Sequence, residues 1–187
     1  MEYLIQQFLK QNNLTGTIGI DYSLRDDGEG VYIDKWNYEI SKPKFTQEQF
    51  DKAILEEAKN KKLAELSKFY DSSECWTYTL FSNLTKTYAS LTRDADFFAK
   101  LLPCCGGKTI QFLDDQNKVV NYSLTIEKAD NLNYKINVNN GTAIRVKKLE
   151  LENKIAIANT IEIIDSIDIK TELLNSVERN IDLDKFN

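Results

Sequence analysis

Pro43 and the residues that follow it place the strongest constraint on how this chain can fold. Proline disfavours helical backbone at the residue before it, so residues 41–45 predict a linker. Thr46 and Gln49 then stand at the T-x-x-Q spacing of a capping box, which marks a helix N-terminus. The residues that continue an apolar helical pattern are Phe50, Ile54, Ala58, Leu63, Leu66 and Phe69. A long helix from about Gln47 to about Tyr70 is therefore expected.

The residues before this linker predict a small unit of one helix and one hairpin. Leu4, Ile5, Phe8 and Leu9 lie on one helical face, and the Asn12-Asn13 pair favours a stop. Residues 21–24 and 31–36 alternate in a strand-like way. The acidic, glycine-bearing segment 25–30 between them fits a hairpin turn better than a calcium loop, because it lacks the order of ligands that a calcium loop needs.

Three parts are expected along the chain. The middle of the long helix, residues 56–65, is highly charged, as in a solvated connector. We therefore predict an N-terminal helix-hairpin unit over residues 1–45, a linking helix over 46–71 and a C-terminal α+β unit over 72–187. The predicted fold class is α+β, with the hairpins of the C-terminal unit packed on helices.

The C-terminal unit is expected to begin with a strand at residues 75–80. The residues that next keep helical spacing, up to Pro103, are Leu84, Tyr88, Leu91, Ala95, Phe98 and Leu102. They predict a helix. Residues 109–113 and 118–124 predict a second hairpin.

Residues 142–169 allow two interpretations. Their large apolar residues fall on odd positions from Leu149 to Ile169, which suggests an array of strands. The segment 147–158 is nevertheless rich in Lys, Leu, Glu and Ala, and Asn159-Thr160 provides a break and a cap. Two helices are the favoured interpretation, and strands are the alternative.

Composition excludes several kinds of chemistry. The chain of 187 residues has no His, which removes the commonest general base and zinc ligand. Its net charge of −5 argues against nucleic acid as a partner. Cys75, Cys104 and Cys105 are expected to be buried or incidental thiols. Residues 106–109 match only the end of a phosphate-binding loop and are expected to form a turn. We expect no catalytic residue, no cofactor and no metal.

The N-terminal residues and the lengths of the apolar runs indicate where in the cell the protein is expected. Glu2 stands where a secretory signal has positive charge, and no apolar run approaches the roughly 20 residues that span a bilayer. A soluble protein of the cytoplasm, with no membrane partner, is expected.

Four aromatic residues gather around the first predicted hairpin. They are Tyr22, Tyr32, Trp36 and Tyr38. Aromatic side chains on a small sheet either pack its core or anchor a partner. Core packing is the favoured interpretation, and these four are the candidate partner-binding residues.

Two stretches resemble phage proteins. Residues 24–54 resemble small tail-module proteins of phages and prophages, in which an acidic turn leads to a strand ending in Trp-Asn, a proline linker and a helix. The matching residues are Asp26, Asp27, Gly28, Gly30, Tyr32, Ile33, Trp36, Asn37, Pro43 and Thr46. Residues 76–168 are similar in element order to an uncharacterised domain family encoded beside tail-fibre genes. That order includes a helix with Arg93, a hairpin, and a closing helix followed by Ala158-Asn159-Thr160.

This resemblance implies a binding role without catalysis. The expected function is that of a tail-fibre assembly chaperone or tail accessory protein in the cytoplasm of a host bacterium, with a fibre or tail protein as partner. One alternative is a permanent component of the tail or baseplate, which is virion-associated. A further alternative is a phage-encoded inhibitor of a host defence protein. Association of the chain with itself into a homo-oligomer is a further open alternative.

Overall fold

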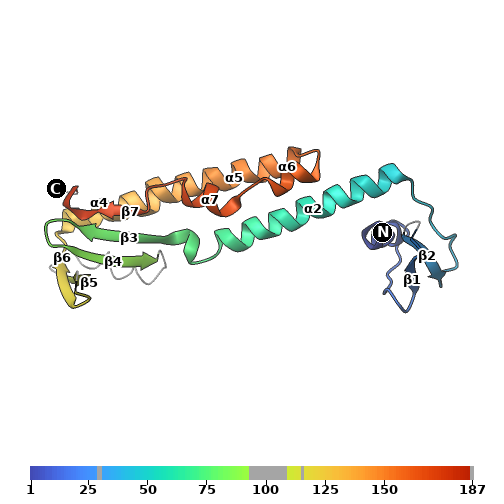
Figure 1. The fold of residues 1–187 in the computed structure, drawn as a ribbon, viewed down its shortest axis with the longest axis horizontal. Coiled ribbons are helices and arrows are strands. Elements are labelled where there is room, and N and C mark those ends of the chain that lie inside the picture. Colours follow the sequence, from blue (N-terminus) through green and yellow to red (C-terminus); the bar gives the residue numbers. More distant parts are fainter. Residues whose placement is uncertain (29–30, 93–108, 115, 186–187) are drawn as a thin grey trace. The chain divides into compact units, whose positions relative to one another are not determined.

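The computed structural model describes residues 1–28, 31–92, 109–114 and 116–185 (Figure 1). The chain forms two compact units. The N-terminal unit comprises residues 1–62 with 158–164, and the C-terminal unit comprises residues 63–157 with 165–187. Helices and two sheets share the chain, which confirms the predicted α+β class.

The N-terminal unit opens with helix α1, Glu2–Gln11. Ile5 and Leu9 lie on its buried face. The helix ends at the Asn pair, as predicted: the Asn12 side chain donates a hydrogen bond to the Phe8 carbonyl at 2.9 Å, and Asn13 has a φ of 56°. A left-handed residue just after the last turn is a common way to end a helix.

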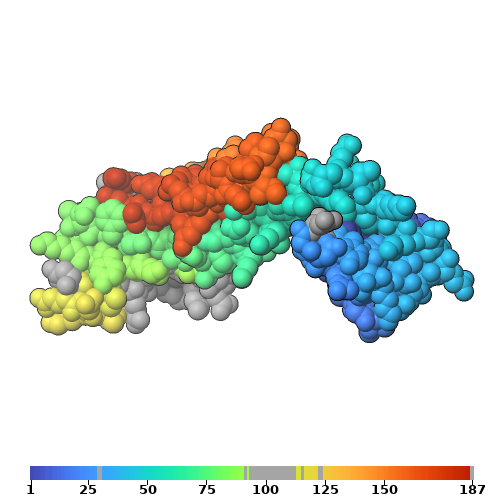
Figure 2. All heavy atoms as spheres, turned by 45° about the vertical axis from the view of Figure 1, so that its right-hand side comes forward, coloured from blue at the N-terminus to red at the C-terminus, as the bar shows by residue number. Residues whose placement is uncertain are grey.

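Strands β1, Tyr22–Asp26, and β2, Val31–Trp36, form the predicted hairpin. They pair antiparallel, with Tyr22 opposite Trp36 and Asp26 opposite Val31. In the turn, the Gly28 N–H donates to Asp26 Oδ1 at 2.9 Å, and Gly28 has a φ of 91°, which glycine adopts without strain. Figure 2 shows the blue atoms of this part of the chain gathered into one small body.

Helix α2 spans Gln47–Tyr70, the range predicted from its sequence. Both reciprocal hydrogen bonds of the predicted capping box are present. Thr46 N donates to Gln49 Oε1 at 2.8 Å, and Gln49 N donates to Thr46 Oγ1 at 3.3 Å. These bonds satisfy two backbone donors that the first turn cannot pair internally.

The C-terminal unit contains a five-stranded sheet. Its strands are β3 (Thr77–Ser82), β4 (Thr87–Thr92), β5 (Thr109–Asp114), β6 (Val119–Ser123) and β7 (Asn180–Asp182). The order across the sheet is β6-β5-β4-β3-β7, and only β7 runs parallel to its neighbour. The strand predicted at residues 75–80 begins two residues later, after the short 3-10 helix η1, Glu74–Trp76. The predicted hairpin of residues 109–124 is confirmed as β5 and β6.

The helix predicted from Leu84 onward is wrong for residues 84–92. Residues 83–86 are a turn, in which Lys86 has a φ of 52°, and β4 follows it in register with β3. Leu84 is 85% exposed, so it belongs to no buried helical face. The Thr and Tyr residues of β4 favour a strand, and pairing with β3 outweighs the helical spacing of the apolar residues. The rest of that predicted helix, residues 93–102, lies outside the described residues.

Helices make up most of the chain after β6, and the strand alternative for residues 142–169 is wrong. Helix α4, Ile126–Asn133, leads through a π-helical segment η3, Tyr134–Asn140, into α5, Gly141–Ile157. Two short helices follow, α6 (Ile161–Asp165) and α7 (Ile169–Leu174), and the 3-10 helix η4, Leu183–Lys185, comes after β7.

Two apolar clusters make the core of this unit. One joins Tyr78 and Leu80 of β3 to Leu132 and Ile136 of the helical segment and to Ile181 of β7. The other has a larger share of helical residues. Its buried members are Leu66, Cys75, Ile144, Leu151, Ile155, Ile167, Ile169 and Leu173.

Candidate functional site

Three of the four candidate aromatics hold the N-terminal unit together. Tyr22 is fully buried, and its hydroxyl accepts a hydrogen bond from Gln6 Nε2 at 2.8 Å. Burial raises the pKa of the Tyr22 hydroxyl above its ordinary value. Trp36 packs on Tyr38 with ring centroids 4.7 Å apart, and Trp36 Nε1 donates to the Ile40 carbonyl at 2.8 Å. These contacts are those of a core.

Tyr32 differs from the other three. It follows Val31 on β2, and its side chain is 37% exposed, whereas the next residue, Ile33, is buried. Desolvation, followed by the carboxylates of Asp27 and Asp34, raises the pKa of the Tyr32 hydroxyl above its ordinary value. Partner binding by the aromatics stays a prediction, and Tyr32 is the one with substantial exposed surface.

Tyr32 lines an apolar groove within the N-terminal unit, which we call the Tyr32 groove. Its volume is about 510 Å³. Met1, Val31, Tyr32, Phe50 and Ile54 make its apolar walls, and Asp27 and Gln47 are its polar lining. Val31 is 44% exposed and Ile54 is 48% exposed. These partly exposed side chains offer apolar surface that a partner can cover.

The positions of the groove residues on β2 and α2 explain how their side chains come together. Val31 and Tyr32 open β2, directly after the acidic turn, while Phe50 and Ile54 lie one turn apart on α2, so their side chains share a face. Phe50 also meets Phe45 edge to face, with ring centroids 5.9 Å apart. Sequence reasoning identified Tyr32 but assigned Phe50 and Ile54 to a packing face. The one signal in the sequence that could have identified them as groove residues was their position directly after the capping box.

A second groove of the same unit is more polar. It has a volume of about 530 Å³ and lies between α1, the Pro43 linker and α2. Leu4, Phe8 and Phe45 contribute apolar surface to it. Its many amide and charged side chains are Gln7, Gln11, Lys44, Gln49, Lys52 and Glu56. Such a lining matches an apolar segment less well than the Tyr32 groove does.

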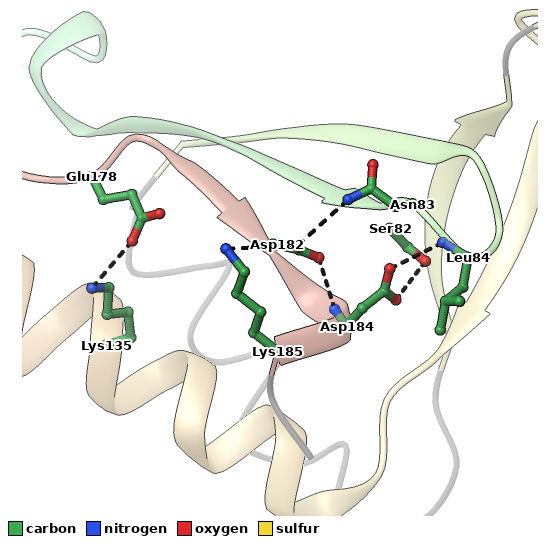
Figure 3. Close-up of polar contacts among 8 residues, drawn as sticks. All are labelled: Ser82, Asn83, Leu84, Lys135, Glu178, Asp182, Asp184 and Lys185. Carbon is green, nitrogen blue, oxygen red and sulfur yellow. Dashed lines mark hydrogen bonds and ion pairs between the residues drawn. The ribbon is translucent and has the colours of Figure 1, made fainter.

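A cluster of carboxylates in the C-terminal unit is structural in its contacts (Figure 3). Asp184 Oδ1 accepts from the Ser82 hydroxyl at 2.7 Å, and Asp184 Oδ2 accepts from the Leu84 N–H at 3.0 Å. These bonds, the Leu84 N–H first, hold the pKa of Asp184 below its ordinary value. Asp182 accepts from Asp184 N and from Asn83 Nδ2, and it lies 3.9 Å from Lys185 Nζ. The carboxylates fasten the β3–β4 turn to the segment after β7.

Several predicted sites carry no chemistry that can be described. Arg93, Cys104, Cys105 and residues 106–108 lie outside the described residues. Cys75 is buried, and burial raises the pKa of its thiol, which disfavours the reactive thiolate. Within the described ranges, no group of three or more Cys, Asp or Glu side chains could hold a metal ion.

Two further findings are the absence of a membrane-spanning helix among the described residues and the outcome of comparisons with known proteins. None of the helices in the part of the chain that the structure describes has both the length and the apolar character needed to cross a membrane. No family model matches the chain, and neither a curated protein nor a solved structure matches it.

Proposed function

We propose that the chain is a non-enzymatic assembly chaperone or accessory protein of a phage tail fibre, which binds a fibre subunit through the Tyr32 groove. The observation that carries the proposal is the exposure of Val31, Tyr32 and Ile54 around one apolar groove. Tyr32 also belongs to the stretch of residues 24–54 that resembles phage tail-module proteins.

The chemistry of the groove suits an apolar segment of an unassembled subunit. Ile54 is 48% exposed, so covering the rest of it contributes about 1 kcal/mol, and a few such residues suffice for reversible binding. Reversible binding is what a chaperone needs, because the fibre must leave it on assembly.

The first experiment is co-expression with the fibre gene nearest to the gene of this chain. We expect more soluble fibre protein and a complex that co-purifies. Tyr32→Ala and Ile54→Asp should each weaken that complex about tenfold or more. Ile20→Asp is the matched control, because Ile20 is 67% exposed in the same unit and does not line the groove. Unchanged fibre solubility with no complex would contradict the proposal.

The alternative of a permanent tail component has its own test. Quantitative mass spectrometry of purified particles counts this chain against the major tail protein. A chaperone should be absent or far below the stoichiometry of the tail, whereas a tail component should be present in stoichiometric copies.

A further inference from the structure

Helix α5 carries apolar residues on two opposite faces. Ile144, Leu151 and Ile155 are at most 1% exposed and pack in the core of the C-terminal unit. Val146 and Leu149, on the same helix, are 48% and 59% exposed. A helix that packs on only one side would place polar residues at these two positions.

The exposed face follows a heptad pattern. Five residues on it are spaced four, three, four and three apart, which is the spacing of the a and d positions in a coiled coil. They are Thr142 (d), Val146 (a), Leu149 (d), Asn153 (a) and Ala156 (d), and all five are exposed. In the same frame, Ile144 and Leu151 take the f position, opposite the seam, and they face the core of their own unit. We call the five residues the α5 seam.

The residue types of the seam indicate its occupant. A β-branched residue at a with Leu at d favours two parallel strands, and a single Asn at an a position fixes the register of such pairs. Val146, Leu149 and Asn153 have this order. In a parallel pair in register, Asn153 of one copy meets Asn153 of the other, so the two amides satisfy each other.

The charges beside the seam are complementary to a second copy. Arg145 occupies a g position and Glu150 the following e position, which face each other across a parallel pair. Arg145 is exposed, and the Glu150 side chain is 56% exposed. Lys147 Nζ lies 2.7 Å from Glu150 Oε2, which leaves the other carboxylate oxygen for Arg145 of the second copy.

We propose that the α5 seam binds the α5 seam of a second copy of this chain in a parallel, in-register homodimer. The seam covers only about two heptads, yet α5 is already folded against its own core, so the dimer does not have to pay for helix formation. The seam shares no residue with the Tyr32 groove, so this dimer and fibre binding are separable.

Sedimentation of the full chain over a wide range of concentration tests the proposal. We expect a monomer–dimer equilibrium that Leu149→Glu shifts to monomer by at least about tenfold in Kd. Val119→Glu is the control for an added surface charge, since Val119 is 63% exposed on β6 and lies outside the seam. A chain that stays monomeric throughout, or a dimer that Leu149→Glu leaves unchanged, would overturn the proposal.

Charge reversal tests the orientation. Arg145→Glu and Glu150→Arg should each raise the Kd severalfold, and the two together should restore it. Failure of the double variant to restore the Kd would contradict the parallel register. Asn153→Leu keeps the proposal testable if Leu149→Glu folds poorly, because it should tighten association and admit larger assemblies; no change in association would count against the seam.

Discussion

The apolar cores inside the two units of this protein differ in size and composition. The buried cluster of the N-terminal unit consists of Ile5, Leu9, Tyr22 and Ile33, and partly buried aromatic rings complete it. Each of the two clusters in the C-terminal unit has eight buried residues. A small unit buries a smaller fraction of its surface on folding than a large one does. Both units add directional contacts, such as the bond from Tyr38 Oη to the Thr15 carbonyl at 3.0 Å in the N-terminal unit and the bonds of Asp184 in the C-terminal unit.

The largest effect is expected from a cavity in the C-terminal unit. Leu151→Ala should lower the free energy of unfolding by about 2–5 kcal/mol, because Leu151 is 1% exposed in a cluster that cannot collapse freely. Urea unfolding followed by far-UV circular dichroism measures it. Leu149→Ala is the matched control, two residues away and 59% exposed, and should cost less than about 0.5 kcal/mol in the monomer. Similar losses for both would contradict the assignment of inner and outer faces.

In the N-terminal unit, the sharpest test is steric. A Cβ added at Gly16 would lie 1.6 Å from Tyr38 Oη and 3.1 Å from Leu9 Cδ1. Gly16→Ala should therefore displace the Tyr38 ring, break its bond to Thr15 and cost about 1–3 kcal/mol. Near-UV circular dichroism should report the loss of the Trp36–Tyr38 contact. A variant with the wild-type spectrum and stability would show that aromatic packing does not hold this unit.

The cap of α2 should contribute less. Thr46→Ala removes the hydroxyl that accepts from Gln49 N and should cost about 0.5–2 kcal/mol. Hydrogen exchange of the amides at residues 47–50 should speed up, because the first turn frays. Thr46→Ser keeps the hydroxyl and should preserve protection, so equal exchange in the two variants would argue against the capping box.

The smallest effect concerns the pH dependence of the C-terminal unit. Because the folded-state pKa of Asp184 lies below its ordinary value, its carboxylate stabilises the unit at pH values above the ordinary Asp range, near 3.9. That contribution is lost as the pH falls through the lowered pKa. Asp184→Asn should therefore be less stable than wild type at neutral pH, and the gap should narrow in acid. Asp130→Asn, at an exposed position of α4, is the control for the removal of a surface charge. A gap for Asp184→Asn that is constant with pH would contradict this role.

The sequence was sufficient for elements that are defined by local signals. The capping box at Thr46 fixed the start of α2, and the acidic turn with Gly28 marked the first hairpin. Each of these signals acts within a few residues, so no distant contact was needed to interpret it. The α+β class followed from these elements and from the β5–β6 hairpin.

Elements that depend on distant partners were missed. Strand β7 has three residues and pairs with β3 about a hundred residues earlier, so no local sequence pattern predicts it. Strand β4 was missed for another reason: its partner β3 is its neighbour in the chain, but the spacing of Leu84, Tyr88 and Leu91 imitates a helix.

The strand-like alternation in the C-terminal third has a physical explanation. Residues two apart on a helix point in nearly opposite directions. Leu149 and Leu151 of α5 therefore lie on its outer and inner faces, and a helix with two apolar faces imitates a strand. The Tyr32 groove was missed for a different reason: Phe50 and Ile54 have the spacing of an ordinary buried helix face, so the sequence did not distinguish them from core residues.

The pairing of β7 with β3 also has a consequence for the newly made chain. Ile181 and Leu183 complete the cluster around Tyr78 and Leu80, and they are joined to β3 by contacts that span about a hundred residues. Contacts at such separation form late, because the intervening chain must first be made and its loop closed. A product interrupted before Asn180 lacks β7, so β3 becomes an unpaired edge of the sheet. The sheet is therefore complete only after its last strand has been synthesised.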